Sequence, residues 1–217
     1  MTKAAPFLAS IALAIPSLQA AAPVEHTEAQ EPAARVLTVR IYNYAGVDAA
    51  IVREGAAMAR EIYLRSGVET RWTICKMPGA GLDFDEACEG GQRPDTLKMR
   101  IVRTAPGQDG VNYLVFGFAL LGKDGFGTVA SVLWERISET ADLSKVTPAR
   151  LLGFVMAHEA GHLLLGFNSH SAEGMMSGRW DEERFKKISQ GSLNFIGKQK
   201  QRIQAGAEAR LLASARR

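Results

Sequence analysis

The sequence predicts a single α/β domain built on a mixed, mostly parallel five-stranded sheet. Apolar and polar residues alternate over 37–42 and again over 68–74, and a segment with helical apolar spacing lies between them. Three more strand-like segments follow, and after them an apolar helix over 148–165. A chain of 217 residues, 47% of them hydrophobic, is large enough to bury one substantial core.

The first three elements form a β-α-β unit. Strands are predicted at 37–42 and 68–74, where every second side chain is apolar. The backing helix between them is expected to begin after the cap residue Asp48 and to end at Ser66-Gly67. A unit of this length implies two parallel strands joined by a right-handed crossover.

Three further strands complete the predicted sheet. They are expected at 97–101, 113–120 and 128–135, and the glycine-rich segment 122–127 is expected to form the turn between the last two. Because no Lys-Ser or Lys-Thr pair follows these glycines, turn formation explains them better than phosphate binding does.

The C-terminal region is predicted to form a small helical subdomain. One helix is expected from Asp181 to about Ser189, and a basic helix from about Gly197 to Ala213. A surface helix that packs a stripe of Ile203, Leu211 and Leu212 is favoured over a membrane-binding or partner-binding helix.

The N-terminus resembles an export signal. Residues 1–21 combine Lys3, an apolar run over 7–15 and small residues before a cleavage site, which is typical of a secretory signal peptide. A retained membrane anchor is the weaker alternative because the apolar run is too short to span a bilayer. The predicted organisation is therefore signal peptide 1–21, flexible leader 22–34 and domain 35–217, and the expected protein is bacterial and secreted or periplasmic.

Charge and cysteine content fit an exported protein. The net charge of +3 is small and shows no nucleic-acid-binding pattern, so no nucleic-acid partner is expected. Cys75 and Cys88 are the only cysteines, and in an exported chain a disulfide between them is the favoured interpretation. A cysteine bound to a metal is the less favoured alternative.

The chemistry of the chain is concentrated in His158-Glu159-Ala160-Gly161-His162. Residues four apart lie on the same helix face, so His158 and His162 point toward one place and can form two corners of a zinc site. Glu159 is adjacent, where a carboxylate can act as general base toward water. A Thr147-Pro148 start and an apolar sequence around the motif predict a rigid, buried ligand helix.

His170 is the predicted third ligand. On a continuing helix it would lie roughly 12 Å beyond His162, so the chain must turn back. Gly166 can end the helix by taking the left-handed conformation, and Asn168 and Ser169 are typical turn residues. Three histidines with one open position are typical of catalytic zinc, whereas structural zinc sites are usually closed by four ligands.

This stretch resembles the zinc motif and Met-turn of the metzincin metallopeptidases. It is more similar to a group of bacterial secreted proteins with His-Glu-x-Gly-His-Leu-Leu-Leu-Gly, Asn-Ser-His-Ser and Gly-x-Met segments before a tryptophan; here these are 158–166, 168–171, 174–176 and Trp180. Compared with the common metzincin spacing, the glycine comes one residue later and the third histidine two residues later. The predicted order of strands and helices also agrees with the metzincin N-terminal subdomain.

The resemblance implies a metzincin-like fold and a role for each residue of the motif. Zinc would be held by His158, His162 and His170, with Glu159 as general base and Met176 as the Met-turn residue forming an apolar floor under the metal. It also implies that a peptide substrate lies extended along an edge strand, for which 128–135 is the predicted segment. Asp181 or Glu182 remains an alternative third ligand, although both fit the acidic first turn of a helix.

The predicted function is that of a zinc-dependent metallopeptidase acting on peptide or protein substrates. After signal cleavage no stable membrane insertion is expected. Two other classes stay open: a non-catalytic zinc-binding or regulatory protein on the same fold, and an interaction domain in which the histidines are structural.

Overall fold

The structure is a computed structural model that describes residues 1, 36–75, 88, 91–104 and 115–216. The predicted signal peptide and leader lie outside these residues and stay predictions. Among the helices of the described residues, none combines the length and apolar character needed to cross a bilayer.

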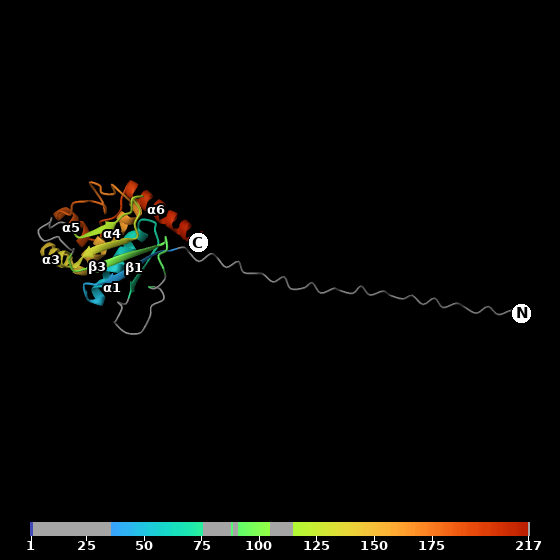
Figure 1. Cartoon of the computed structure of the whole chain (residues 1–217), viewed down its shortest axis with the longest axis horizontal. Helices are drawn as coiled ribbons and strands as arrows, with labels where there is room; N and C mark the ends of the chain where they lie inside the picture. Colours follow the sequence, from blue (N-terminus) through green and yellow to red (C-terminus); the bar gives the residue numbers. More distant parts are fainter. Residues whose placement is uncertain (2–35, 76–87, 89–90, 105–114, 217) are drawn as a thin grey trace. The chain divides into compact units, whose positions relative to one another are not determined.

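The predicted α/β fold class, with a mixed and mostly parallel five-stranded sheet, is confirmed. The strands of the described residues are β1 (Leu37–Asn43), β2 (Thr70–Cys75), β3 (Thr96–Val102), β4 (Gly117–Leu120) and β5 (Val129–Leu133). Their order in the sheet is β2-β1-β3-β5-β4, and among them only the β4–β5 pair is antiparallel. Figure 1 shows the sheet together with the helices around it.

Helix α1 (Ala49–Leu64) joins β1 to its parallel neighbour β2, as predicted. Asp48 caps it by accepting a hydrogen bond from the backbone N–H of Ala50 at 2.7 Å. After the helix the chain turns at Gly67, where φ is 77° and a side chain would be strained. The buried face of α1 packs against helix α4 (Pro148–Leu165), so the first crossover supports the element that carries the histidine motif.

The predicted fifth strand is too long at its C-terminal end. β5 stops at Leu133, and Trp134 begins helix α3 (Trp134–Ser144), which the sequence analysis missed. Ile137 and Ala141 are four residues apart and form the buried side of α3. The apolar residues of β5 run without a break into the aromatic start of α3, so the pattern gives no stop signal at this boundary.

Helix α4 (Pro148–Leu165) lies at the centre of the fold and is buried at every position from Leu151 to Gly161. Its N-terminus is as predicted: Thr147 accepts a hydrogen bond from the backbone N–H of Arg150, and Pro148 occupies the first turn. The hydroxyl of Tyr63 on α1 donates to the carbonyl of Ala157 at 3.0 Å, directly before the histidine motif. This packing holds α4 rigidly.

The C-terminal region consists of α5 (Glu182–Ser189) and α6 (Gly197–Ala215). Ile203 is buried as predicted, but Leu212 is 45% exposed, so the predicted apolar stripe is wrong in its last turn. Arg210 is buried instead, and its guanidinium donates to the carbonyls of Pro94, Gly127 and Leu163. Helix α6 is therefore attached to the core through a buried cation as well as through apolar contacts.

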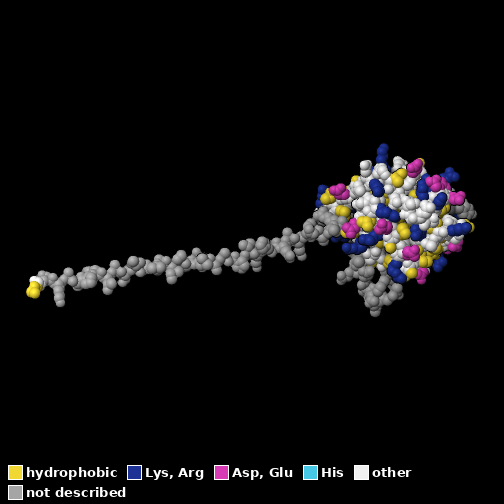
Figure 2. Space-filling view, turned by 180° about the vertical axis from the view of Figure 1, so that it is seen from behind, with side chains coloured by type: hydrophobic (Ala, Val, Ile, Leu, Met, Phe, Trp, Pro, Cys, Tyr) yellow, Lys and Arg dark blue, Asp and Glu magenta, His cyan; other side chains and the backbone are white. Residues whose placement is uncertain are grey.

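The predicted disulfide joins Cys75, at the end of β2, to Cys88, with their Cα atoms 5.6 Å apart. On the face of the molecule seen in Figure 2, basic and acidic side chains are interspersed without a single-sign patch. That distribution agrees with the small net charge of +3.

Candidate metal centre

Helix α4 supplies two of the three histidines. His158 and His162 are four residues apart and project from the same face, so their ring centroids lie only 4.7 Å from each other. His158 is buried at 5% exposure, whereas His162 near the end of the helix is partly exposed.

The chain turns back directly after α4. Gly166 caps the helix with its N–H donating to the carbonyl of His162, at φ 76° and ψ −156°. This is not the predicted left-handed helical conformation but an extended one with positive φ, which is almost restricted to glycine. Asn168 follows with φ 53°, in the left-handed region that asparagine tolerates. The predicted stop at Gly166 is therefore correct, and it brings residue 170 back toward the helix.

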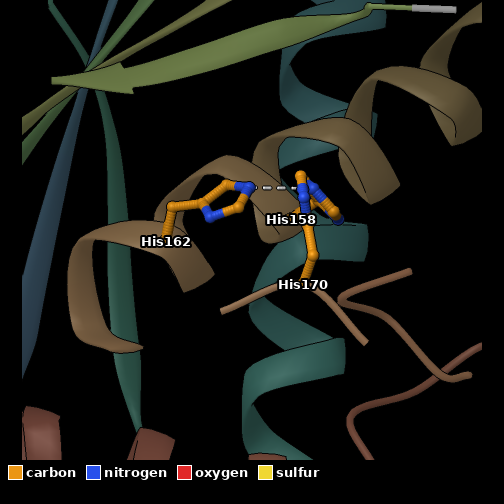
Figure 3. Close-up of side chains that lie close together, drawn as sticks. All are labelled: His158, His162 and His170. Atoms are coloured by element: carbon orange, nitrogen blue, oxygen red, sulfur yellow. Dashed lines mark hydrogen bonds between the residues drawn. The ribbon is translucent and has the colours of Figure 1, made fainter. Parts of the chain in front are cut away.

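His170 lies beside the helix pair, as Figure 3 shows. Its ring centroid is 5.4 Å from that of His158 and 4.7 Å from that of His162. One nitrogen from each of the three rings lies within 4.8 Å of the other two. The structure thus brings together the three histidines that the sequence analysis singled out, although they come from a helix and a loop.

Each helix histidine has a partner on the ring nitrogen that faces away from the cluster. Nδ1 of His158 donates to the backbone carbonyl of Met175 at 2.7 Å. Nδ1 of His162 lies 2.6 Å from the hydroxyl of Ser169. Such outer contacts fix ring orientation at metal sites, because they leave the opposite nitrogen, Nε2, directed at the ion.

Burial keeps the two helix imidazoles neutral. The pKa of His158 is lowered to about 4 and that of His162 to about 3; loss of solvation is the largest cause in both, and the neighbouring histidines add to it at His162. A metal ligand must be the neutral imidazole. The helix pair is therefore in the ligand-competent protonation state at neutral pH.

Glu159 points into the same cavity and is also buried. Burial raises the pKa of its carboxyl group to about 8. Its Oε2 atom has no hydrogen-bond partner among the described residues. A Cβ at Gly117 of β4 would lie 2.7 Å from Cγ of Glu159, so this glycine leaves the space that the carboxyl group occupies.

Met176 lies in the turn after His170 and is completely buried. A Cβ at Gly161 of α4 would lie 2.6 Å from Sδ of Met176 and 3.2 Å from the ring of Phe195. The segment that contains Met176 therefore packs closely against Gly161, where any larger residue would clash. The methionine forms an apolar contact with the helix that carries the histidines, and its Met-turn role stays a prediction.

A cavity of about 290 Å³ opens over the cluster. Its walls include the three histidines, Glu159, Trp180 and residues 117–119 of β4. The prediction that 128–135 is the edge strand is wrong, because β5 lies between β3 and β4. Within the described residues the edge strand beside the cavity is β4, which pairs antiparallel with β5.

The two residues that remained as alternative third ligands, Asp181 and Glu182, both belong to the N-terminus of helix α5. Asp181 caps α5 by accepting hydrogen bonds from the backbone N–H and the guanidinium of Arg184. Glu182 is the first residue of α5. Among the described residues, the one His/Cys/Asp/Glu group with a ligand-like arrangement is that of the three histidines.

The residues present fit a zinc ion. Three neutral imidazoles are a donor set that zinc prefers, and a water or substrate can take a fourth position. The buried carboxyl of Glu159 with its unpaired oxygen provides a nearby acceptor for such a water. A site closed by four protein ligands, as in structural zinc centres, is not formed by the described residues.

Sequence reasoning missed several residues around the centre. Ser169 was assigned only a turn role, although its hydroxyl contacts His162. Gly117 and Trp180 were given no part in the cavity, yet Trp180 lies 5.7 Å from His158 between ring centroids. Trp180 could have been found from its place after the Gly-Met-Met segment, whereas Gly117 has no signal without the strand pairing.

Fold and cluster together define an α/β protein with a candidate three-histidine metal centre. No protein-family model matches the sequence. No curated protein matches it either.

The solved structures that are similar to the chain at low sequence identity include the following three. A zinc-dependent peptidase from Methanocorpusculum labreanum is 14% identical with a TM-score of 0.48, covering 76% of this chain and 99% of that one. Archaemetzincin from Methanopyrus kandleri is 16% identical with a TM-score of 0.48, covering 82% and 98%. Myroilysin is 14% identical with a TM-score of 0.32, covering 82% and 68%.

Proposed function

We propose that the chain is a zinc-dependent metallopeptidase that hydrolyses peptide bonds. The observation that carries this proposal is the convergence of three histidines and a buried glutamate on one cavity beside an edge strand. In this proposal His158, His162 and His170 bind the ion. The resemblance of the 158–176 stretch to the metzincin motif supports the same assignment.

Zinc, when bound, supplies a Lewis acid that acidifies water and polarises a carbonyl oxygen. Glu159 acts as the general base: its carboxylate accepts a proton from the attacking water and later delivers it to the leaving amine nitrogen. Burial brings the pKa of Glu159 to about 8, close to neutral pH, so the side chain can both accept a proton and give it up. Trp180 and residues 117–119 of β4 line the cavity beside Glu159.

The substrate in this proposal is an extended peptide paired with β4. Within the described residues β4 has a strand on one side only, so its other edge offers unpaired backbone groups. An extended peptide can add to such an edge through main-chain hydrogen bonds. Residues 117–119 line the cavity, so the pairing would bring a peptide bond next to the histidines and Glu159.

The proposed site of action is outside the cytoplasm. The disulfide between Cys75 and Cys88 supports it, because disulfides form and persist in oxidising compartments. The predicted signal peptide over 1–21 points the same way. Expression of the full chain in a bacterium, followed by N-terminal sequencing of the exported material, checks this: a mature N-terminus near residue 22 is expected.

The test of the catalytic proposal is Glu159→Gln, which keeps the shape of the side chain but cannot act as a base. Loss of a general base reduces turnover by roughly 10²–10⁴-fold. We expect wild-type protein to carry zinc and to cleave unfolded protein substrates, with activity lost to a chelator and restored by zinc. The Glu159→Gln variant should carry the same amount of zinc and show the loss in turnover.

Glu182→Gln is the matched control, because it makes the same chemical change at the start of α5. It should change neither zinc content nor cleavage. Full cleavage by Glu159→Gln rules out the mechanism, and zinc without cleavage in the wild type points to the non-catalytic binding protein. Wild-type protein without zinc would mean that the histidines are structural.

A further inference from the structure

The loop over 170–175, which contains His170, contacts helix α6 through the side chain of Gln199. This residue is the third of α6 and is buried at 8% exposure. Its Nε2 donates to the hydroxyl of Ser171 at 2.6 Å and to the carbonyl of Glu173 at 2.9 Å. Gln199 and Ser171 are 28 residues apart in the sequence, so these bonds join two segments that no local pattern connects.

The amide of Gln199 does more than cap its own helix. Its Oε1 accepts a hydrogen bond from the backbone N–H of Ile196 at 3.1 Å, which satisfies a donor at the start of α6. That cap uses only the oxygen, and a glutamate side chain provides it equally well. The two bonds donated by Nε2 therefore have another role, and both of them end in the loop.

The backbone of the loop is fitted to the start of α6. Gly174 has φ 73°, and a Cβ there would lie 3.0 Å from Oε1 of Gln199 and 3.1 Å from the carbonyl oxygen of Asn194. Glycine readily combines that conformation with so close an approach. The N–H of Met175 donates to the same carbonyl at 2.9 Å. The loop and the segment around the start of α6 are therefore in contact at several residues.

These contacts fix the backbone directly after His170. The hydroxyl of Ser171, which accepts from Gln199, donates in turn to the carbonyl of Glu173 at 2.8 Å. The N–H of Ser171 donates to the carbonyl of Met176 at 2.9 Å. Because the side chain of His170 is exposed, its place beside the histidines of α4 depends on the backbone that carries it more than on core packing.

We propose that Gln199 is a positioning residue of the metal centre: it holds the loop so that the imidazole of His170 stays beside the two histidines of α4. This inference rests on the proposed zinc binding and extends the centre to a helix that lies outside the histidine motif. A ligand that is already held in place loses less conformational freedom when it binds. Positioning by Gln199 therefore increases the affinity for zinc.

Three variants test the assignment. Gln199→Met removes the amide. Gln204→Met is the matched control on the same helix, because Gln204 donates to the carbonyl of Ser66 at 2.9 Å and not to the loop. Gln199→Glu keeps the helix cap, and a carboxylate is favoured at a helix N-terminus, but it donates no hydrogen bond.

Three measurements are made on each variant. Zinc affinity is measured by competition with a chelator. The visible absorption of the cobalt-substituted protein reports the coordination of the metal at a temperature where every variant is folded. Hydrogen exchange of the N–H groups of Ser171 and Met175 in zinc-free protein reports how firmly the loop is held.

We expect Gln199→Met and Gln199→Glu to bind zinc roughly tenfold more weakly, at the low end of the usual cost of losing an outer contact, because His170 itself remains. Their cobalt absorption should lose intensity, since water replaces His170 in part of the molecules. Without zinc, the N–H groups of Ser171 and Met175 should exchange faster than in the wild type. Gln204→Met should match the wild type in all three measurements.

Wild-type zinc affinity in Gln199→Met would overturn the inference. Wild-type affinity in Gln199→Glu would also overturn it, because the loss in Gln199→Met would then come from the helix cap. An equal loss in Gln204→Met would assign the effect to the docking of α6 as a whole. If the wild type takes up no zinc, the proposed function fails, and hydrogen exchange of the zinc-free variants still decides whether Gln199 holds the loop.

Discussion

The two halves of the candidate metal centre are built in different ways. His158 and His162 project from a helix that is buried on nearly every side, whereas His170 lies in a loop and is exposed to solvent. The helix half is held by the packing of α1, the sheet and α6. The loop half is held by individual hydrogen bonds, such as Met175 N–H to the carbonyl of Asn194 and Ser171 N–H to the carbonyl of Met176, and by the buried side chains of Met175 and Met176.

This difference indicates that the helix and the loop contribute to metal binding in different ways. The helix provides a fixed pair of donors whose separation is set by the helix repeat. The loop completes the set, but its donor His170 is exposed, and exposed segments open more easily than a packed core. The three ligands should therefore contribute unequally to metal affinity, although they have the same chemistry.

The largest expected effect comes from comparing His158→Ala with His170→Ala. Loss of the buried ligand should reduce zinc affinity by more than about 100-fold, beyond the usual effect of an outer-contact change. Loss of the exposed loop ligand should cost less, because solvent water can reach the vacated position. Zinc affinity by chelator competition measures both. Equal losses in the two variants would contradict the division between helix and loop.

The next effect concerns how the helix half is anchored. Arg210 of α6 donates to three carbonyls, one of them that of Leu163 in the last turn of α4, while exposed Arg202 donates to that of Leu165 alone. Replacing Arg210 by Met leaves buried carbonyls without donors and should lower the free energy of unfolding by about 2–4 kcal/mol. Arg202→Met should cost only about 0.5–1.5 kcal/mol.

Denaturant unfolding of both arginine variants measures these free energies. The position of α4 should change little in either folded variant, so zinc binding should persist below the unfolding transition. A stability of Arg210→Met equal to that of Arg202→Met would show that the buried guanidinium is not an anchor of the helix.

The sequence predicts the helix half of the centre far better than its surroundings. Local rules suffice for α4, because its cap, its first-turn proline and the four-residue spacing of His158 and His162 all lie within one segment. The stop at Gly166 is also local, since only glycine readily takes its backbone conformation. The position of His170 beside the helix is also predictable, because the chain can turn back once α4 ends at Gly166.

What the sequence does not reveal depends on contacts between distant segments. The edge position of β4 results from strand pairing, which a list of separate strands does not contain. Arg210 belongs to a helix with many exposed charges, and only the carbonyls of Pro94, Gly127 and Leu163 distinguish it from the others. Gly117 is likewise required only because β4 lies against Glu159.

The smallest expected effect probes the loop half alone. Gly178 lies beside His170, and a Cβ there would be 3.1 Å from its Nδ1, so Gly178→Ala should displace the ring by a few tenths of an ångström. Zinc affinity should fall by about tenfold, as for other changes next to a ligand, while the melting temperature stays the same. Gly91→Ala is the control, because a Cβ at position 91 meets nothing within 4 Å.

If Gly178→Ala binds zinc as tightly as Gly91→Ala, the loop adapts to the added methyl group and His170 is not held by its neighbour. If the melting temperature falls as well, residue 178 supports the fold rather than the ligand, and the two halves of the centre are less separate than their burial indicates.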